Sequence, residues 1–270
     1  MEGIDEGVRV GGEVVKDVRF ADDQGMVASS GEGLQKMMDG LNETAKRYDM
    51  KINVRKTKTM VVSREEGKTV RIIIDRQQVE QVKTFKYLGA VMTENGTCME
   101  DVKTRIGMAK VAFNKTRELV TKGLNIGLKK RLVKTLVWSV ALYGCETWTM
   151  KKEVVDKLKA FEMWVWRRME KVSWKDKKTN EEVLMMVGEE RCFVETIIKR
   201  KRNWIGHVGN GFLKLVIEGR MVGKKPEGRP RMEMTDDIMD ESYVEMKRMA
   251  NDRKKWRSWT SRTCQKAENR

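Results

Sequence analysis

Two adjacent carboxylates, Asp22 and Asp23, are the side chains whose type and spacing in this sequence best suit a chemical reaction. They follow Phe20 and Ala21 at the end of a valine-rich segment, which predicts a strand leading into a tight turn. Neighbouring residues of a regular strand point to opposite faces, whereas a tight turn lets one or both carboxylates reach a divalent cation. Magnesium prefers oxygen ligands, and a pair of such ions can stabilise the attacking and leaving oxygens of phosphoryl transfer.

An acidic pair also has a simpler explanation, because aspartate is common in solvated turns that do no chemistry. Asp22 and Asp23 alone therefore indicate a metal site only weakly. The strands, helix and motifs predicted around them are needed to distinguish a metal site from a solvated turn.

The elements that must position the pair are short strands and one helix. Gly11-Gly12 predicts a turn before the valine-rich strand, and an apolar run resumes at 26–28. Ser29 and Glu32 have the spacing of a capping box, and apolar residues then recur at helical intervals over 34–48. Further β-rich segments follow at 59–63, 70–74 and 85–91. We therefore expect a sheet backed by a helix within roughly the first 95 residues.

Helical spacing dominates the rest of the chain, which only two prolines interrupt. Thr97 and Glu100 predict a capping box for a helix that ends near Gly123, and Thr179 and Glu182 predict another. Further helices are expected at 128–143, 154–171, 180–188 and 193–202, and an amphipathic helix with a frayed end at 243–256. The predicted fold class is α+β, with a small antiparallel sheet followed by a mainly helical region.

The charge balance favours a polyanionic partner. Lysine and arginine number 56 against 40 aspartates and glutamates, which gives a net charge of +16. Such a surplus attracts nucleic acid, because each cation placed on a phosphate releases condensed counterions. No apolar stretch has the roughly 18 residues of a spanning helix, since Lys134 interrupts the best candidate at 132–143. We expect a soluble protein that does not bind membranes.

The remaining composition predicts an intracellular protein, cytoplasmic or nuclear. The first residues are acidic and do not form a secretory signal. The four cysteines lie far apart without a C-x-x-C spacing, which fits free thiols in a reducing compartment. His207 is the only histidine, so a histidine-dependent nucleophile or a zinc site is improbable, and we expect a structural role for it.

Several motifs together resemble one protein family. The Phe20-Ala21-Asp22-Asp23 hairpin, the following helix, the segment 52–58 and the segment 85–89 stand in the order and spacing of the palm in reverse transcriptases of LINE-type, non-LTR retrotransposons. The segments 143–148, 200–208 and 228–231 are similar to the helical region that follows the polymerase core. The resemblance covers essentially the whole chain. It departs from the family at Met234, where a tryptophan usually stands.

The resemblance implies roles for individual residues. Asp22 and Asp23 correspond to magnesium-binding catalytic carboxylates, and Asn53, Lys56 and Thr57 match a segment whose lysine assists pyrophosphate departure. Lys56 or Lys58 fits that role. The segment 85–89 resembles the primer-grip hairpin, which positions the growing 3′ end, and its residues are Phe85, Lys86, Tyr87, Leu88 and Gly89.

The resemblance, the composition and the helical spacing together divide the chain into four parts. They are a partial palm at 1–95, a helical thumb and connection at 96–218, a basic Gly/Pro linker at 219–234 and a C-terminal helix and tail at 235–270. Only 19 residues precede Phe20, so the fingers and the strand with the remaining metal-binding aspartate are expected to be missing. We expect an inactive fragment that binds Mg²⁺ only if the site is completed. Its expected partners are an RNA template and a DNA primer, with the missing N-terminal portion acting in trans.

Two basic segments could follow a nucleic-acid backbone while tryptophans stack on bases. The candidate tryptophans are Trp164, Trp166, Trp204, Trp256 and Trp259. The cations concerned are Lys199, Arg200, Lys201, Arg202, Arg229 and Arg231. The alternative is a solvated helix face with the tryptophans in the core, which we favour for Trp164 and Trp204. Two functions therefore stand: a fragment of an RNA-directed DNA polymerase, or a non-enzymatic basic helical protein that binds RNA or DNA.

Overall fold

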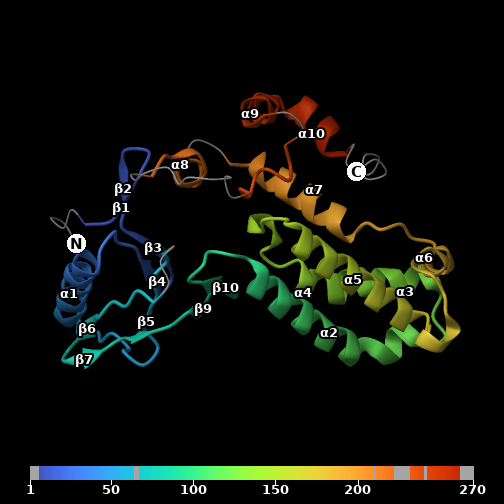
Figure 1. Ribbon diagram of the computed structural model, residues 1–270, viewed down its shortest axis with the longest axis horizontal. Helices are drawn as coiled ribbons and strands as arrows, with labels where there is room; N and C mark the ends of the chain where they lie inside the picture. The colour runs from blue at the N-terminus through green and yellow to red at the C-terminus, as the bar shows by residue number, and fades with distance from the viewer. Residues whose placement is uncertain (1–5, 64–66, 209–210, 222–231, 240–241, 262–270) are drawn as a thin grey trace. The chain divides into compact units, whose positions relative to one another are not determined.

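The computed structural model describes residues 6–63, 67–208, 211–221, 232–239 and 242–261 (Figure 1). The chain forms two compact units. The first, here the hairpin unit, comprises residues 1–96 and 208–229. The second, the helical unit, comprises residues 97–207 and 230–270. The combination of small sheets with many helices confirms the α+β class.

The strands of the hairpin unit pair two by two. Four pairs are antiparallel: β1 (Val8–Val10) with β2 (Glu13–Val15), β3 (Asp17–Phe20) with β4 (Asp23–Met26), β6 (Ile73–Ile74) with β7 (Gln77–Gln78), and β9 (Thr84–Tyr87) with β10 (Ala90–Thr93). The fifth pair, β5 (Lys58–Thr59) with β8 (Glu80–Gln81), is parallel. The expected antiparallel sheet is thus present among the described residues only as separate pairs.

Two-residue turns explain why hairpins dominate this unit. Asp75 and Arg76 join β6 to β7 with φ of 47° and 64°, and Leu88 and Gly89 join β9 to β10 with φ of 47° and 83°. Positive φ at both central positions matches the twist of the adjoining strands, so each turn brings its two strands together locally. Tight turns of this kind account for antiparallel pairs without a continuous sheet, whereas the parallel pair of β5 and β8 joins strands 22 residues apart.

One helix supports the core of the hairpin unit. α1 (Gly31–Arg47) begins after Ser30, whose hydroxyl accepts a 3.0 Å hydrogen bond from the Gly33 amide, so the cap lies one residue after the expected Ser29. The small buried core consists of Met38, Ile72, Ile74 and Val79. The side-chain amide of Gln35 on α1 donates to the Ile73 carbonyl and accepts from the Ile73 amide, both at 2.8 Å. A short helix, α8 (Phe212–Glu218), also belongs to this unit.

The helical unit contains the remaining helices. They are α2 (Met99–Thr121), α3 (Ile126–Leu132), a π-helical stretch η1 (Val133–Trp138), α4 (Ser139–Ala141), the 3₁₀ turn η2 (Cys145–Thr147), α5 (Lys152–Met169), the 3₁₀ turn η3 (Trp174–Asp176), α6 (Asn180–Val187), α7 (Phe193–Ile205), α9 (Tyr243–Asn251) and α10 (Arg253–Ser261). The capping box of Thr179 and Glu182 is confirmed. The predicted start of α2 is wrong, because Cys98 rather than Thr97 occupies the N-cap. The expected C-terminal helix is divided at Asp252 into α9 and α10.

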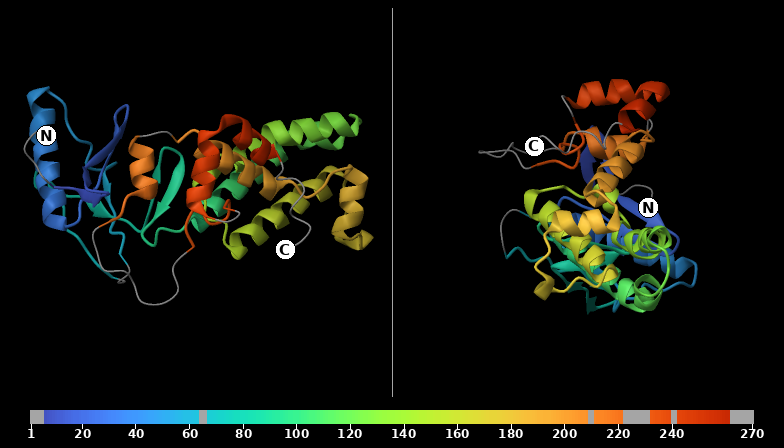
Figure 2. Two further views of the ribbon diagram at one scale, coloured as in Figure 1. Left: turned by 90° about the horizontal axis from the view of Figure 1, so that it is seen from above. Right: turned by 90° about the vertical axis from the view of Figure 1, so that its right-hand side faces the viewer.

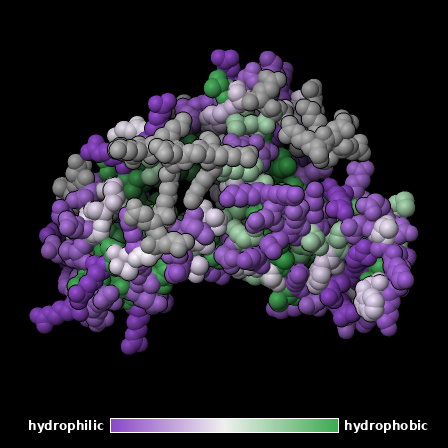
Figure 3. Space-filling view, viewed as in Figure 1, coloured by the Kyte–Doolittle hydropathy of each residue, from purple (hydrophilic) through white to green (hydrophobic). Residues whose placement is uncertain are grey.

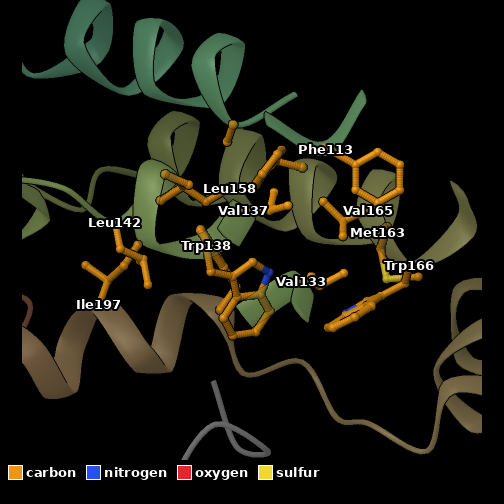
Figure 4. Packing of buried hydrophobic residues seen from close by; sticks show 14 of the residues in the cluster. Phe113, Val133, Val137, Trp138, Leu142, Leu158, Met163, Val165, Trp166 and Ile197 are labelled. Carbon is orange, nitrogen blue, oxygen red and sulfur yellow. The ribbon is translucent and has the colours of Figure 1, made fainter. Parts of the chain in front are cut away.

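Aliphatic and aromatic side chains together form the core of the helical unit (Figure 4). The ring of Trp138 lies 4.9 Å from that of Phe193 in an edge-on arrangement and 5.7 Å from that of Trp166. Trp148 is buried, and its indole N–H donates a 2.8 Å hydrogen bond to the Asp101 carboxylate. Edge-on ring pairs and the hydrogen bond of the Trp148 indole stabilise such a core beyond the area that it buries.

Candidate functional site

The acidic pair lies at the tip of the β3–β4 hairpin, as the sequence predicts. Phe20 and Asp23 are opposite each other at the last register position, and Ala21 with Asp22 forms the turn between them. Ala21 has a φ of 53°, which tightens the reversal. All four side chains are exposed, and Phe20 leaves 64% of its surface accessible. Both carboxylates can therefore face a ligand outside the chain.

Polar contacts fix the base of this hairpin. The Asp17 carboxylate accepts hydrogen bonds from the Arg19 guanidinium at 2.6 Å and from the Gln24 amide at 3.2 Å. Arg19 of β3 and Gln24 of β4 are register partners, so the Asp17 carboxylate binds one residue of each strand. The exposed tip is thus carried on a hairpin whose side chains lock its register.

The hairpin that resembles a primer grip lies directly beside the acidic hairpin. The Tyr87 hydroxyl of β9 donates a 3.3 Å hydrogen bond to the Val18 carbonyl of β3. A Cβ added at Gly25 would lie 3.9 Å from the Tyr87 ring, which shows how closely that ring approaches β4. Segments more than 60 residues apart are thereby brought together. Within β9–β10, Lys86 and Leu88 are exposed, while Phe85, Tyr87 and Gly89 are half-buried.

The segment 52–58 contains the two candidate lysines, of which Lys58 forms an ion pair and Lys56 faces solvent. The Asn53 side chain accepts a 3.1 Å hydrogen bond from the Lys56 amide, and its carbonyl accepts bonds of 2.9 Å from the Thr57 amide and hydroxyl. These bonds form a turn that leaves the Lys56 side chain exposed. Lys58 instead pairs with Glu80 at 2.5 Å. The structure therefore favours Lys56 over Lys58 for any role towards a phosphate.

The donors around the acidic pair suit a magnesium ion only in part. Mg²⁺ retains several waters and commonly takes one or two carboxylates, so Asp22 and Asp23 are of the right chemical kind. Within the described ranges, however, no three His, Cys, Asp or Glu side chains are grouped so that they could hold a metal ion. A complete two-metal centre would need a further acidic ligand beyond those in the described part of the chain.

The structure corrects the role expected for Lys201. This side chain is fully buried, and its ammonium donates to the carbonyls of Trp148 and Met234, both at 2.7 Å, and to the Asp237 carboxylate at 2.5 and 2.6 Å. Burial lowers the pKa of Lys201 and raises that of Asp237, and their ion pair opposes both shifts. Lys201 is therefore an internal anchor for the 232–239 segment and cannot reach a nucleic acid.

The neighbouring cations divide between interior and surface. Arg202 is only 8% exposed, donates to the Ile238 carbonyl at 3.2 Å and stacks 3.8 Å from the centroid of the Trp259 ring. Arg200 and Lys199 are both exposed, although Arg200 also donates to the Leu142 carbonyl at 2.8 Å and lies 3.8 Å from Glu146. The helical period of α7 explains this division, because successive residues of the run face different directions. Arg229 and Arg231 lie outside the described residues.

Several tryptophans considered for base stacking are in the interior. Trp166 is fully buried and Trp256 is 6% exposed, while Trp164 and Trp204 are half-buried. The Arg168 guanidinium lies 4.4 Å from the centroid of the Trp164 ring. Sequence reasoning missed the most exposed ring, Trp174, which leaves 84% of its surface accessible. Its position among lysines, between Ser173 and Asp176 of a capping box, was the available signal.

Comparison with known proteins supports a transposon origin. The chain is 24% identical over 268 residues to a transposon-derived protein of Caenorhabditis elegans, a match covering 92% of this chain and 96% of that protein. No established protein family and no solved structure matches the chain. The similarity assigns no activity. Among the residues that the structure describes, no helix has the length and apolar character needed to cross a membrane.

Proposed function

We propose that this chain is the palm and thumb portion of a LINE-type RNA-directed DNA polymerase. The observation that carries the proposal is the acidic pair at a hairpin tip, with the Tyr87 hairpin hydrogen-bonded to its side. The order of the motifs and the similarity to a transposon-derived protein over nearly the full chain support it.

In this proposal each element has a distinct task. Asp22 and Asp23 would hold magnesium, which when bound supplies charge stabilisation for nucleotidyl transfer. Lys56 is exposed on a turn fixed by Asn53, and its ammonium would neutralise or protonate the departing pyrophosphate. The β9–β10 hairpin would position the primer terminus through backbone and apolar contacts, because its Tyr87 lies against the acidic hairpin.

The proposed catalytic centre is incomplete in this chain. Since the described residues contain no grouping of three potential metal ligands, we propose that another polymerase segment completes the site in trans. These 270 residues alone would then bind template and primer without extending the primer.

Primer extension tests this proposal. The chain alone is expected to be inactive on a primed RNA template, and addition of the N-terminal portion of a LINE-type polymerase should give magnesium-dependent extension. Asp22→Asn should abolish that extension, because it removes a charged ligand. Asp156→Asn, an exposed residue of α5, is the matched control and should retain it. Extension that survives Asp22→Asn would contradict the assignment of the metal site.

A second function needs no catalysis: nucleic-acid binding by a basic protein. The net charge of +16 and the largely hydrophilic surface in Figure 3 favour it. Binding of labelled RNA or DNA measured over a salt series should weaken steeply as the salt concentration rises. Affinity that is independent of salt, or no binding at all, would refute it.

A further inference from the structure

The loop between α5 and α6 exposes a large apolar ring. Trp174 lies in the turn η3 and leaves 84% of its surface accessible to solvent. A buried indole stabilises a fold through the large area that it removes from water, and here the chain forgoes that gain. Tryptophan is highly buried on average, so exposure to this extent is uncommon for an indole.

The loop holds this ring outside by well-defined local structure. The Ser173 amide donates to the Asp176 carboxylate at 2.6 Å, and the Ser173 hydroxyl accepts from the Lys175 amide at 3.3 Å. The Arg167 guanidinium, projecting from the last turn of α5, donates to the Lys178 carbonyl and to the Asn180 side chain, both at 2.9 Å. Both ends of the loop are thereby fastened, so Trp174 is presented on a preorganised turn.

The surroundings of the ring are strongly cationic. Lys171, Lys175 and Lys177 are exposed, and the Lys175 ammonium lies 6.0 Å from the centroid of the Trp174 ring. The nearby carboxylate of Asp176 is engaged by the Ser173 amide within the turn. The loop therefore combines an exposed aromatic ring with several exposed positive charges. Its backbone is part of the yellow segment between α5 and α6 in Figure 2.

Single-stranded nucleic acid is the ligand that uses both features. An unpaired base offers a π face that stacks on an exposed indole, and the phosphates on either side attract lysines. In a duplex the bases already stack on each other, so only the lysines could contribute. An acidic protein could pair with the lysines, but its carboxylates would not use the exposed Trp174 ring.

We propose that Trp174 and the lysines at 171, 175 and 177 form a stacking site for one base of single-stranded RNA or DNA. This site deepens the proposed function, since it names a surface of the helical unit that would hold unpaired template. It does not depend on Asp22 or Asp23, so loss of primer extension leaves it standing.

Fluorescence anisotropy with labelled 12-nucleotide strands tests the site in the full chain. Trp174→Ala should weaken binding of single-stranded RNA or DNA by about 5- to 150-fold, the range of one lost base stack. It should change binding of a duplex of equal length by less than about twofold. Trp174→Phe should recover most of the affinity, because phenylalanine retains a ring for stacking. Comparison of RNA with DNA strands shows which of the two the site prefers.

Matched variants separate stacking from charge and from apolar contact. Lys175→Gln should weaken single-strand binding more than Lys152→Gln, which removes the same charge at the other end of α5. Met185→Ala removes an apolar side chain that is 76% exposed on neighbouring α6 and should leave binding unchanged. Trp174→Ala that binds single strands like the unaltered chain would overturn the site, as would an equal loss for strand and duplex. If the unaltered chain bound no nucleic acid, this site and the binding component of the proposed function would both fail.

Discussion

The acidic pair and the basic run illustrate two opposite uses of clustered charge in one chain. Asp22 and Asp23 lie exposed at the end of a two-stranded hairpin, where water solvates them fully. Lys201 and Arg202 lie in the interior of the helical unit, bound to carbonyls, to Asp237 and to an aromatic ring. In the sequence both motifs are short charged runs next to apolar residues, and both suggested function.

The difference follows from local geometry. A two-residue turn directs adjacent side chains outward, because few atoms surround the tip. On a helix, four consecutive residues sample every direction, so a basic run on a helix that packs against the core, such as α7, places some cations towards it. A buried cation then requires acceptors, and Lys201 finds them in distant parts of the chain. Clustered charge on a helix is therefore a poorer indicator of a binding surface than clustered charge at a hairpin tip.

The largest expected effect is that of removing the internal cation. Lys201→Met leaves Asp237 buried without its partner and should lower the free energy of unfolding by about 3–5 kcal/mol, measured by urea denaturation. Lys199→Met, at an exposed position of the same helix, should change it by less than about 0.5 kcal/mol. The double variant Lys201→Met with Asp237→Asn removes both charges, keeps an oxygen acceptor for the Met150 amide, and should recover part of the loss. A loss below about 1 kcal/mol for Lys201→Met would contradict the internal ion pair.

The second expected effect concerns thiols close to charged residues. Burial, with a smaller contribution from Glu146, raises the pKa of Cys145 from 9.0 to about 11, although the Arg200 guanidinium lies 4.0 Å from its sulfur. Burial together with the charge of Glu162 raises the pKa of Cys192 from 9.0 to about 12. Thiolates form only as the pH approaches these values. At pH 8 the thiolate fraction is therefore lower than that of a thiol with a pKa of 9.0, by about 100-fold for Cys145 and about 1000-fold for Cys192.

Alkylation by iodoacetamide, followed by mass spectrometry from pH 7 to 10, measures this effect. Both thiols should react slowly in the folded chain and faster in urea. If Cys145 reacted in the folded chain as fast as in urea, the basic run would be activating this thiol. The basic run would then not serve only in internal packing, unlike the exposed acidic pair.

A third prediction concerns how the C-terminal helices pack on the basic run. A Cβ at Gly206 would overlap the indole of Trp256, so Gly206→Ala should displace α10 and cost about 1–3 kcal/mol in unfolding free energy. Gly107→Ala is the matched control, because a Cβ there meets no neighbouring atom and alanine favours the interior of α2. It should stabilise the chain by about 0.5–1 kcal/mol. Equal effects at both glycines would disprove the tight contact with Trp256.

The smallest expected effect is at the acidic pair. Asp22→Asn and Asp23→Asn should each change the unfolding free energy by less than about 0.5 kcal/mol, because both side chains are solvated. Thermal or urea denaturation measures it. A destabilisation above about 1 kcal/mol would show that the pair supports the hairpin and would weaken its assignment as a metal site.

The sequence was informative wherever a local rule acts. The acidic hairpin, the helix after it and the capping box of Thr179 and Glu182 depend on neighbours within a few residues, and all three were predicted. The start of α2 was misplaced because Thr97 satisfied the capping pattern without being the N-cap. The exposed Trp174 was missed because the apolar character of tryptophan suggests burial, while its exposure depends on how α5 and α6 are joined.

The sequence by itself determined that two carboxylates stand at a hairpin tip, since a two-residue turn is specified by its own residues and those beside it. Only the tertiary structure decided which cations remain available. Lys201 is bound to Asp237, 36 positions further along the chain, and Arg202 stacks on Trp259, 57 positions further along. No local sequence pattern contains that information. Burial is a property of the packed chain, because it depends on which distant segments exclude water from a given side chain.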